Sequence, residues 1–276
     1  MNRPSRDRRL ARKACAGAAW LATALVALAG CGPPPPPTGS LEPLEARSRL
    51  HAERRERRVQ VCEVRAALRL ETAAAGRLPA VSVVARLAGP DRARLQARWV
   101  LGTLVDVVLS GDTLRAWMPS RRLGLELPSF ADTLGVPEPG RVLRQALAAS
   151  WPAPREAWRR ANADSAGARL AWREAGEDWT LLVDRAGRPR EVSWAREGRG
   201  LEVRYAGWRG RGSSAWPTRI ELADPAGGFR VELSLEDVRP LGRASPAWFS
   251  LALPADVAPF GFDDLRRALA TREDSP

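Results

Sequence analysis

Residues that could carry covalent chemistry are scarce in this chain of 276 residues. It has three cysteines and a single histidine, His51, which stands in a highly charged segment. No serine or cysteine motif accompanies that histidine, so we expect neither a catalytic triad nor a metal site. The acidic pairs Glu177-Asp178 and Asp263-Asp264 fall in expected turns or caps, where carboxylates are usually solvated. The sequence therefore predicts no enzyme, no cofactor and no metal.

The N-terminus gives Cys31 a specific chemical role. Residues 1–13 contain six basic residues and one acid, residues 14–30 are uncharged, and Leu28 to Cys31 form the sequence LAGC. A basic region, an apolar run and a small-residue cleavage site are typical of a secretory signal. The LAGC sequence resembles the lipobox of bacterial lipoproteins, which implies cleavage before Cys31 and a thioether-linked lipid on it. The alternative is an ordinary signal peptide with a chance cysteine. Gly32, rather than aspartate, after the lipidated position favours the outer membrane.

A proline run separates this leader from the rest of the chain. Five consecutive prolines, Pro33 to Pro37, predict a stiff, extended spacer of roughly 3 Å per residue. We therefore expect a signal peptide over 1–30, a lipidated cysteine and tether over 31–40, and one domain over 41–276. Cys62 falls in an apolar strand pattern and is expected to be a small core residue. With Cys31 lipidated, no internal disulfide is expected.

The basic charge does not point to nucleic acid. The formal net charge is +12, and a strongly basic balance can mark a nucleic-acid-binding surface. Part of it belongs to the leader, nearly every basic residue is arginine, and the arginines are scattered along expected strands rather than clustered. We expect no nucleic-acid partner. A mild preference for anionic headgroups or acidic partners is the better interpretation.

Most of the domain shows strand periodicity. In residues 92–99, polar side chains alternate strictly with Ala93, Leu95, Ala97 and Trp99. Such alternation puts one face of a strand in water and the other in an apolar interior. The same pattern occurs in 81–87, 201–205 and 229–235, and further strands are expected near 61–70, 104–109, 113–118, 168–174, 178–183, 190–196 and 217–223. Short connections rich in turn residues predict antiparallel pairing.

Helices are expected at four places. Residues 41–58 predict a polar helix with a thin apolar stripe of Leu41, Leu44 and Leu50, and 138–150 an amphipathic helix. Helix and loop are expected over 151–166, and a short helix over 262–270.

The predicted fold class is α+β: a curled antiparallel half-barrel of about ten strands with a helical lid. A large sheet with one apolar face must curl and be covered. Helices too few to cover it tightly would leave an apolar cavity that suits acyl chains, lined by Val83, Leu95, Trp99, Phe229, Val231 and Leu233. A fully packed core is the equal alternative from pattern alone.

Three stretches carry a resemblance to a known family. They are ARLQARWVLGTLVDVVLSGDTL (93–114), VPEPGRVLRQALAASW (136–151) and the segment 201–238. In this order behind a lipobox they resemble the outer-membrane lipoprotein receptor family LolB, of the LolA/LolB superfamily, over about residues 45–239. Residues 240–276 extend beyond the LolB pattern and look more like a LolA-type ending, which implies a diverged member with a different cargo.

The resemblance implies a function without covalent chemistry. Such a protein, expected to be monomeric and anchored on the periplasmic face of the outer membrane, accepts the acyl chains of lipoproteins from a LolA-like periplasmic carrier. It then releases them into the membrane. The family's membrane-inserting leucine at a hairpin tip matches Leu101, although Val100 stands where the family has proline. Two alternatives stay open: that Leu101 folds back onto the core, and that the chain is a non-carrier structural or sensory envelope lipoprotein.

Overall fold

The computed structural model describes residues 41–73, 76–99, 102–128, 139–212, 215–257 and 259–260. The chain divides into two units, Met1–Gly39 and Ser40–Pro276, and all described residues belong to the second, which is compact by itself. Cys31, Leu101 and the helix expected over 262–270 lie outside the described residues. None of the described helices is long and apolar enough to cross a membrane.

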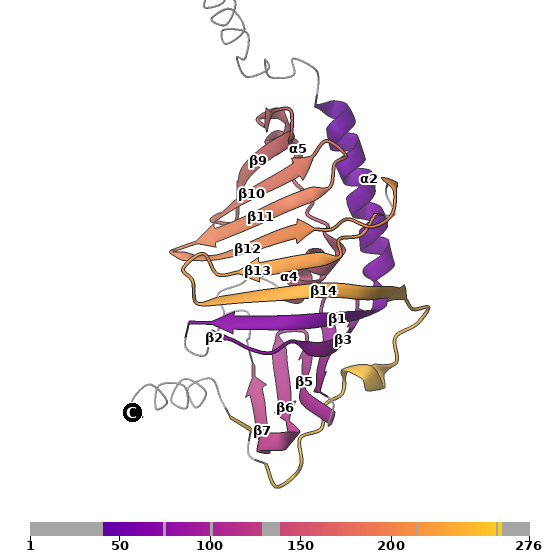
Figure 1. Cartoon of the computed structure of the whole chain (residues 1–276), viewed down its shortest axis with the longest axis vertical. Coiled ribbons are helices and arrows are strands. Elements are labelled where there is room, and N and C mark those ends of the chain that lie inside the picture. Colours follow the sequence, from indigo (N-terminus) through magenta and orange to yellow (C-terminus); the bar gives the residue numbers. More distant parts are fainter. Residues whose placement is uncertain are drawn as a thin grey trace, which may run out of the picture. The chain divides into compact units, whose positions relative to one another are not determined.

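One open, almost entirely antiparallel sheet dominates the unit (Figure 1). Within the described residues it contains 15 strands, in the order β15-β7-β6-β5-β4-β3-β1-β14-β13-β12-β11-β10-β9-β8, with β2 attached to β1. The long strands of the first part are β1 (Val61–Thr72), β3 (Val81–Ala88), β4 (Arg92–Trp99), β5 (Gly102–Ser110), β6 (Thr113–Met118) and β7 (Leu123–Leu127). Those of the second part are β9 (Gly167–Glu174), β10 (Glu177–Asp184), β11 (Pro189–Arg196), β12 (Arg199–Ala206), β13 (Arg219–Ala223) and β14 (Phe229–Pro240).

The predicted strands are confirmed, but the predicted number of about ten strands was too low. Every expected strand is present; β7 was missed, as were three strands of two residues each, β2 (Gly76–Arg77), β8 (Asn162–Ala163) and β15 (Pro259–Phe260). The sequence of β7, LGLEL, has a short alternation interrupted by glycine, which gave too little signal. The pair β15–β7 is parallel. It depends on a contact between residues more than a hundred positions apart, which no local pattern can indicate.

The helices lie on one face of this sheet. They are α2 (Glu42–Val59), α4 (Pro139–Ala148) and α5 (Arg155–Arg159). The described residues also contain two 3-10 turns, η1 (Pro119–Arg121) and η3 (Pro246–Phe249). Figure 1 shows α4 behind the sheet near β13 and β14, and α2 beside the ends of β10–β13. Gly187, in the turn between β10 and β11, has φ +77°, and a Cβ there would lie 2.8 Å from the backbone nitrogen of Ser48. Glycine therefore permits the close approach of this turn to α2.

The buried line along α2 is not the stripe that was expected. Leu50 is 43% exposed, so its assignment to the apolar stripe was wrong. The buried residues are instead Leu44, Ser48, His51, Arg55 and Val59. Steps of three and four residues place them on one face of the helix. Sequence analysis missed this line because three of its five members are polar.

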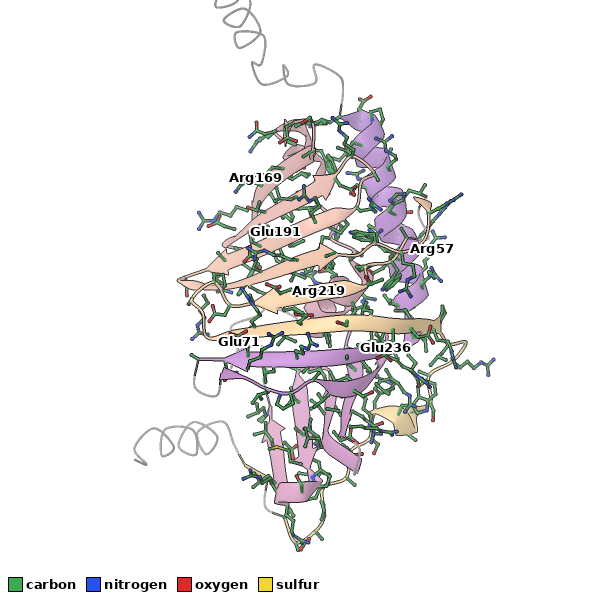
Figure 2. The ribbon with its side chains drawn as sticks, in the orientation of Figure 1. Arg57, Glu71, Arg169, Glu191, Arg219 and Glu236 are labelled. Carbon is green, nitrogen blue, oxygen red and sulfur yellow. The ribbon has the colours of Figure 1, made fainter. Side chains whose placement is uncertain are left out.

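The opposite face of the sheet is polar and covered with ion pairs. Arg204 contacts Glu191, Glu202 and Glu221 from neighbouring positions, and Arg219 pairs with Glu232 at 2.8 Å. Glu191 and Arg219 lie on the face turned to the viewer (Figure 2). Because such exposed pairs contribute about 0–1 kcal/mol each, they do little more than keep this face solvated. In this part of the sheet, stability therefore depends on the apolar face.

Candidate functional site

Tryptophans form the centre of the apolar face in the second part of the sheet. Trp172, Trp179 and Trp194 are direct partners on β9, β10 and β11. The ring of Trp179 stacks on Trp172 at 5.9 Å between centroids and lies 6.5 Å from Trp194. Trp151, which follows α4, approaches Trp179 to 6.0 Å from the helical side. Alternation along three adjacent strands, with one tryptophan from the helical layer, thus builds a continuous aromatic wall.

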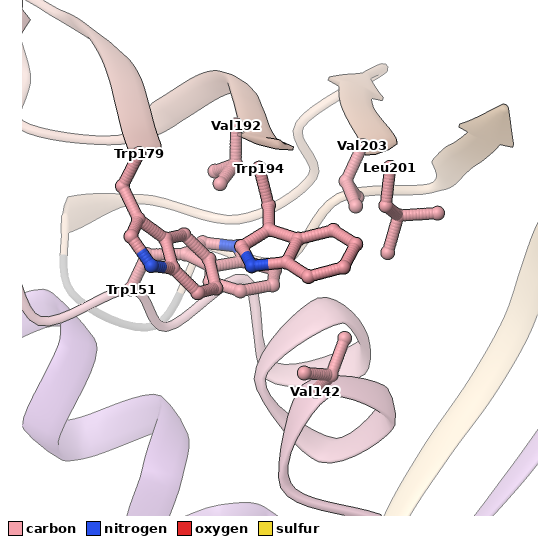
Figure 3. Close-up of a pocket in the computed structure, with 7 residues that line it drawn as sticks. All are labelled: Val142, Trp151, Trp179, Val192, Trp194, Leu201 and Val203. Carbon is pink, nitrogen blue, oxygen red and sulfur yellow. The ribbon is translucent and has the colours of Figure 1, made fainter. Parts of the chain in front are cut away.

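A small closed space lies beside this wall (Figure 3). Its volume is about 10 Å³, and it is lined by Val142, Trp151, Trp179, Val192, Trp194, Leu201 and Val203. A cavity of about 10–15 Å³ by this measure holds a single water molecule. The space therefore has no room for an acyl chain in this state. The open apolar cavity predicted from the pattern is not seen between these described residues, which pack closely instead.

A buried cation, Arg55 of α2, lies next to the aromatic wall. Its side chain is 1% exposed, and its Nη2 donates to the carbonyl of Ala149 at 2.9 Å. The guanidinium carbon lies 5.4 Å from the ring of Trp208. Burial lowers the pKa of Arg55 to about 10, since desolvation disfavours the charged form. The group still carries its charge at neutral pH.

Two donors of that guanidinium have no acceptor. Among the described residues, Nε and Nη1 of Arg55 have no hydrogen-bond partner, and no acidic side chain forms an ion pair with it. Burying a charge without a partner is costly, so such groups are normally paired. The nearby carboxylate of Asp184 already forms an ion pair with Arg188, with 2.7 Å between Oδ2 of Asp184 and Nη2 of Arg188. Arg55 is thus an underused buried cation.

Tyr205 connects Arg55 to the aromatic wall. Its hydroxyl accepts a hydrogen bond of 2.6 Å from Nε1 of Trp151. Burial raises the pKa of Tyr205 above its usual value, while Trp151 and Arg55 act in the opposite direction. The tyrosine is therefore neutral. Arg55, Tyr205 and Trp151 form a polar corner at the side of an otherwise apolar interior.

His51 is the second buried titratable group on α2. It is 7% exposed, and its Nδ1 has no partner among the described residues. Burial is the main cause that lowers the pKa of His51, and the cations of Arg55, Arg188 and Arg54 act in the same direction against Asp184. The imidazole is therefore held in its neutral form. Among the described residues, neither His51 nor any other side chain belongs to a group of three or more that could ligate a metal.

Polar contacts join α2 to α4 and the segment after it. Arg55 donates to the carbonyl of Ala149, as described above. The hydroxyl of Ser150 donates to the carbonyl of Ala52 at 3.3 Å. Arg144 forms an ion pair with Glu56 at 2.8 Å. These contacts hold the two helices together over the apolar face. Separating the helices from the sheet would expose the tryptophan wall.

The predicted cavity-lining residues lie on a different part of the same sheet. They occupy β3, β4 and β14 on either side of β1, and none of them lines the small space described above. Val83 and Leu233 are buried, Leu95 and Val231 are half-buried, and Phe229 is 38% exposed. Trp99 ends β4, and its side chain is outside the described set. A binding role for these residues stays a prediction.

Sequence signals for the residues that do form the site were present but weak. Trp172, Trp179 and Trp194 each stand at an apolar position of an expected strand, and tryptophan is abundant, at 11 residues. Arg55 gave no signal, because an arginine among many in a polar helix normally points to solvent. Cys62, expected in the core, is buried and unpaired, and burial raises the pKa of its thiol to about 12.

Comparisons with known proteins give similarities of structure. Neither a protein-family model nor a curated protein sequence matches the chain. A LolA superfamily protein from Nitrosomonas europaea is 14% identical, with a TM-score of 0.44 over 73% of this chain and 96% of that one. A putative outer membrane lipoprotein-sorting protein domain from Vibrio parahaemolyticus is 12% identical, with a TM-score of 0.46 over 75% of this chain and 97% of that one. The Mycobacterium tuberculosis lipoprotein LppX is 13% identical, with a TM-score of 0.34 over 75% of this chain and 100% of that one. Identities and TM-scores of this size do not establish a family.

Proposed function

We propose that this chain is a lipid-anchored envelope protein that takes up acyl chains between the sheet and helices α2 and α4. The observation that carries the proposal is the aromatic wall of Trp151, Trp172, Trp179 and Trp194, which lies between one apolar sheet face and a helical layer. Apolar side chains separate more easily to admit an apolar ligand than a polar network would. A ligand between the sheet and the helices would contact tryptophans of the sheet and, from the helical side, Trp151.

The driving force would be burial of the ligand's methylene groups. Each CH₂ removed from water contributes about 0.8 kcal/mol. Against this, the helices must move away from the sheet, because the closed space of about 10 Å³ accepts no chain. The contacts of Arg55, Arg144 and Ser150 between the helical segments would be lost or exchanged. A single-step transfer is favoured because a chain left in water gains none of this free energy.

The cellular role follows from the sequence resemblance. The protein would be anchored through Cys31 on the periplasmic face of the outer membrane, accept lipoproteins from a LolA-like carrier, and insert them into the membrane. Leu101, which comes between β4 and β5 in the sequence, would enter the bilayer. If so, Leu101→Glu should leave folding and acyl binding intact and reduce delivery of cargo to liposomes, because a carboxylate opposes insertion. A variant that melts at a much lower temperature would instead place Leu101 in the core, and unchanged delivery by a stable variant would remove the tip from the mechanism.

A non-carrier role is the second candidate, and the closed interior favours it. Tight packing around the small space is what a structural or sensory envelope lipoprotein with a filled core would have. The two candidates differ in one property, the ability of the interior to admit lipid.

The test is whether the unit Ser40–Pro276 binds acyl chains. We expect lipid to co-purify with it and a fluorescent fatty acid to bind, with quenching of tryptophan emission. Trp179→Phe retains an apolar wall and should bind, whereas Leu233→Arg, which buries a charge, should bind weakly. A folded unit that carries no lipid and binds no probe would favour the non-carrier role.

A further inference from the structure

The buried guanidinium of Arg55 has donors to spare. One of its three nitrogens is engaged, by the carbonyl of Ala149, while Nε and Nη1 have no acceptor among the described residues. Such a group is retained in an interior at considerable cost unless something pairs with it. Its position on the buried face of α2, with 1% exposure, excludes a role on the surface.

The neighbours of Arg55 leave its charge without a counterion. Trp208 offers a ring face at 5.4 Å, but the guanidinium of Arg188 lies at the same distance from that ring. His51 is held neutral nearby, and the carboxylate of Asp184 is bound by both side-chain and backbone donors of Arg188. Among the residues that the structure describes, the surroundings are therefore positive on balance and offer no free acidic side chain. They suit an anion that comes from outside the chain.

The same corner borders the aromatic wall. Ala149, which accepts from Arg55, lies two residues before Trp151, and Trp151 both lines the small apolar space and donates to the hydroxyl of Tyr205. Figure 3 shows Trp151, Trp179 and Trp194 around this space, with Val142 of α4 below them. A cation with unused donors thus stands at one side of an apolar region. This is the arrangement that an amphiphile requires, with its head at the cation and its chain along the tryptophans.

We propose that Arg55 binds the anionic head group, a carboxylate or a phosphate, of a single-chain amphiphile whose acyl chain lies along the tryptophan wall. This inference rests on the proposed uptake of acyl chains and adds the class of ligand. On binding, the unused Nε and Nη1 of Arg55 acquire a charged acceptor, while α2 moves away from the segment after α4 as the chain enters. Methyl esters and monoacylglycerols carry no charge in the head group, so the site discriminates against these neutral lipids.

Calorimetric titration of the unit Ser40–Pro276 tests this with matched ligands. Laurate and lauroyl lysophosphatidate carry the charge, as carboxylate and phosphate respectively, and methyl laurate and monolaurin are their neutral counterparts. We expect an anionic member to bind about 10- to 100-fold more tightly than its neutral counterpart, the range that one charge-assisted hydrogen bond provides. Whichever pair shows the larger ratio identifies the head group.

Two variants separate the charge from the fold. Arg55→Met fills a similar volume without charge, and replacing a buried ion by an apolar residue is often tolerated. It should bind the neutral amphiphiles as the parent does and lose the preference for anions. Arg57→Met, an exposed position on the same helix (Figure 2), should keep the preference.

The outcomes are distinct. If anionic and neutral ligands bind equally to the parent unit, or if Arg55→Met keeps the preference, the assignment of Arg55 is wrong while acyl uptake stands. If no amphiphile binds, both proposals fail. Should Arg55→Met prove unfolded, the ratio measured with the parent unit alone still decides.

Discussion

Two regions of one apolar sheet face are built in different ways. In the tryptophan half, strands β9–β13, large side chains such as Trp179, Leu181 and Trp194 are almost completely buried beneath the helical layer. In the aliphatic half, strands β3–β7, Leu87 and Leu109 are also buried, but Leu95 and Val107 on the same face are only half-buried. The same strand alternation thus gives large, deeply buried side chains in the tryptophan half and a mixture of buried and half-buried side chains in the aliphatic half. Alternation alone determines which side chains share a face, and the helices determine how deeply they are buried.

The two halves also differ on the opposite face. Around β3–β5 the segment containing η3 packs onto the sheet: Arg86 lies 5.5 Å from the ring of Trp248, and Nη1 of Arg94 donates to the carbonyl of Trp248 at 3.2 Å. Beneath it, Arg94 and Asp106 form an ion pair of 2.6 Å. The tryptophan half carries solvated ion pairs at the corresponding positions. The aliphatic half is therefore stabilised from the face that the tryptophan half leaves to water.

A matched pair of truncations gives the largest expected difference between the halves. Leu181→Ala, at a position that is 1% exposed, should lower the free energy of unfolding by about 2–5 kcal/mol, because it leaves a cavity in a packed interior. Leu95→Ala, on the same sheet face but half-buried, should cost about 1 kcal/mol. Urea denaturation of the unit Ser40–Pro276 measures both. Equal losses would mean that the two halves are packed alike.

The outer face should show the reverse order with a smaller effect. Trp248→Ala removes the cation–π contact with Arg86 and the cover over the Arg94–Asp106 pair, and should cost about 1–2 kcal/mol. Arg204→Ala, in the exposed ion-pair network of the tryptophan half, should cost less than about 1 kcal/mol. If the arginine change proved the more damaging, the η3 segment would not stabilise the aliphatic half. The same denaturation experiment supplies the values.

The sequence predicted which residues form strands far better than it predicted what lies inside. Period-two alternation in β4 or β12 is local and repeated, so the boundaries of these strands follow from it within a few residues. The depth of burial is not local. Leu50 is exposed and Arg55 buried, although leucine and arginine have the opposite tendencies, because the side of α2 that faces the sheet is set by the approach of the turn at Gly187 and by α4. Closure of the tryptophan half likewise depends on Trp151 from another layer.

The smallest expected effect concerns pH and again distinguishes the two halves. His51 is neutral in the folded state because burial and neighbouring cations lower its pKa. The unfolded chain has the ordinary histidine pKa, near 6.5. Below that value the unfolded state binds more protons than the folded state, so stability rises with pH. The stabilisation is present above about pH 6.5 and is lost as the pH falls through 6.5 toward the folded pKa.

The measurement compares parent and His51→Gln units in urea between about pH 7.5 and 5.5, above the range in which most carboxylates titrate. The parent should lose stability toward the acid end, and the variant should lose less, because glutamine cannot acquire a charge beside Arg55 and Arg188. Since His51 lies on the buried face of α2, the loss should appear as increased accessibility of the tryptophans to a soluble quencher. The slow-exchanging amides of β3–β5 should be unaffected. Equal pH slopes for both proteins would show that protonation of His51 does not weaken the packing of α2 on the tryptophan half.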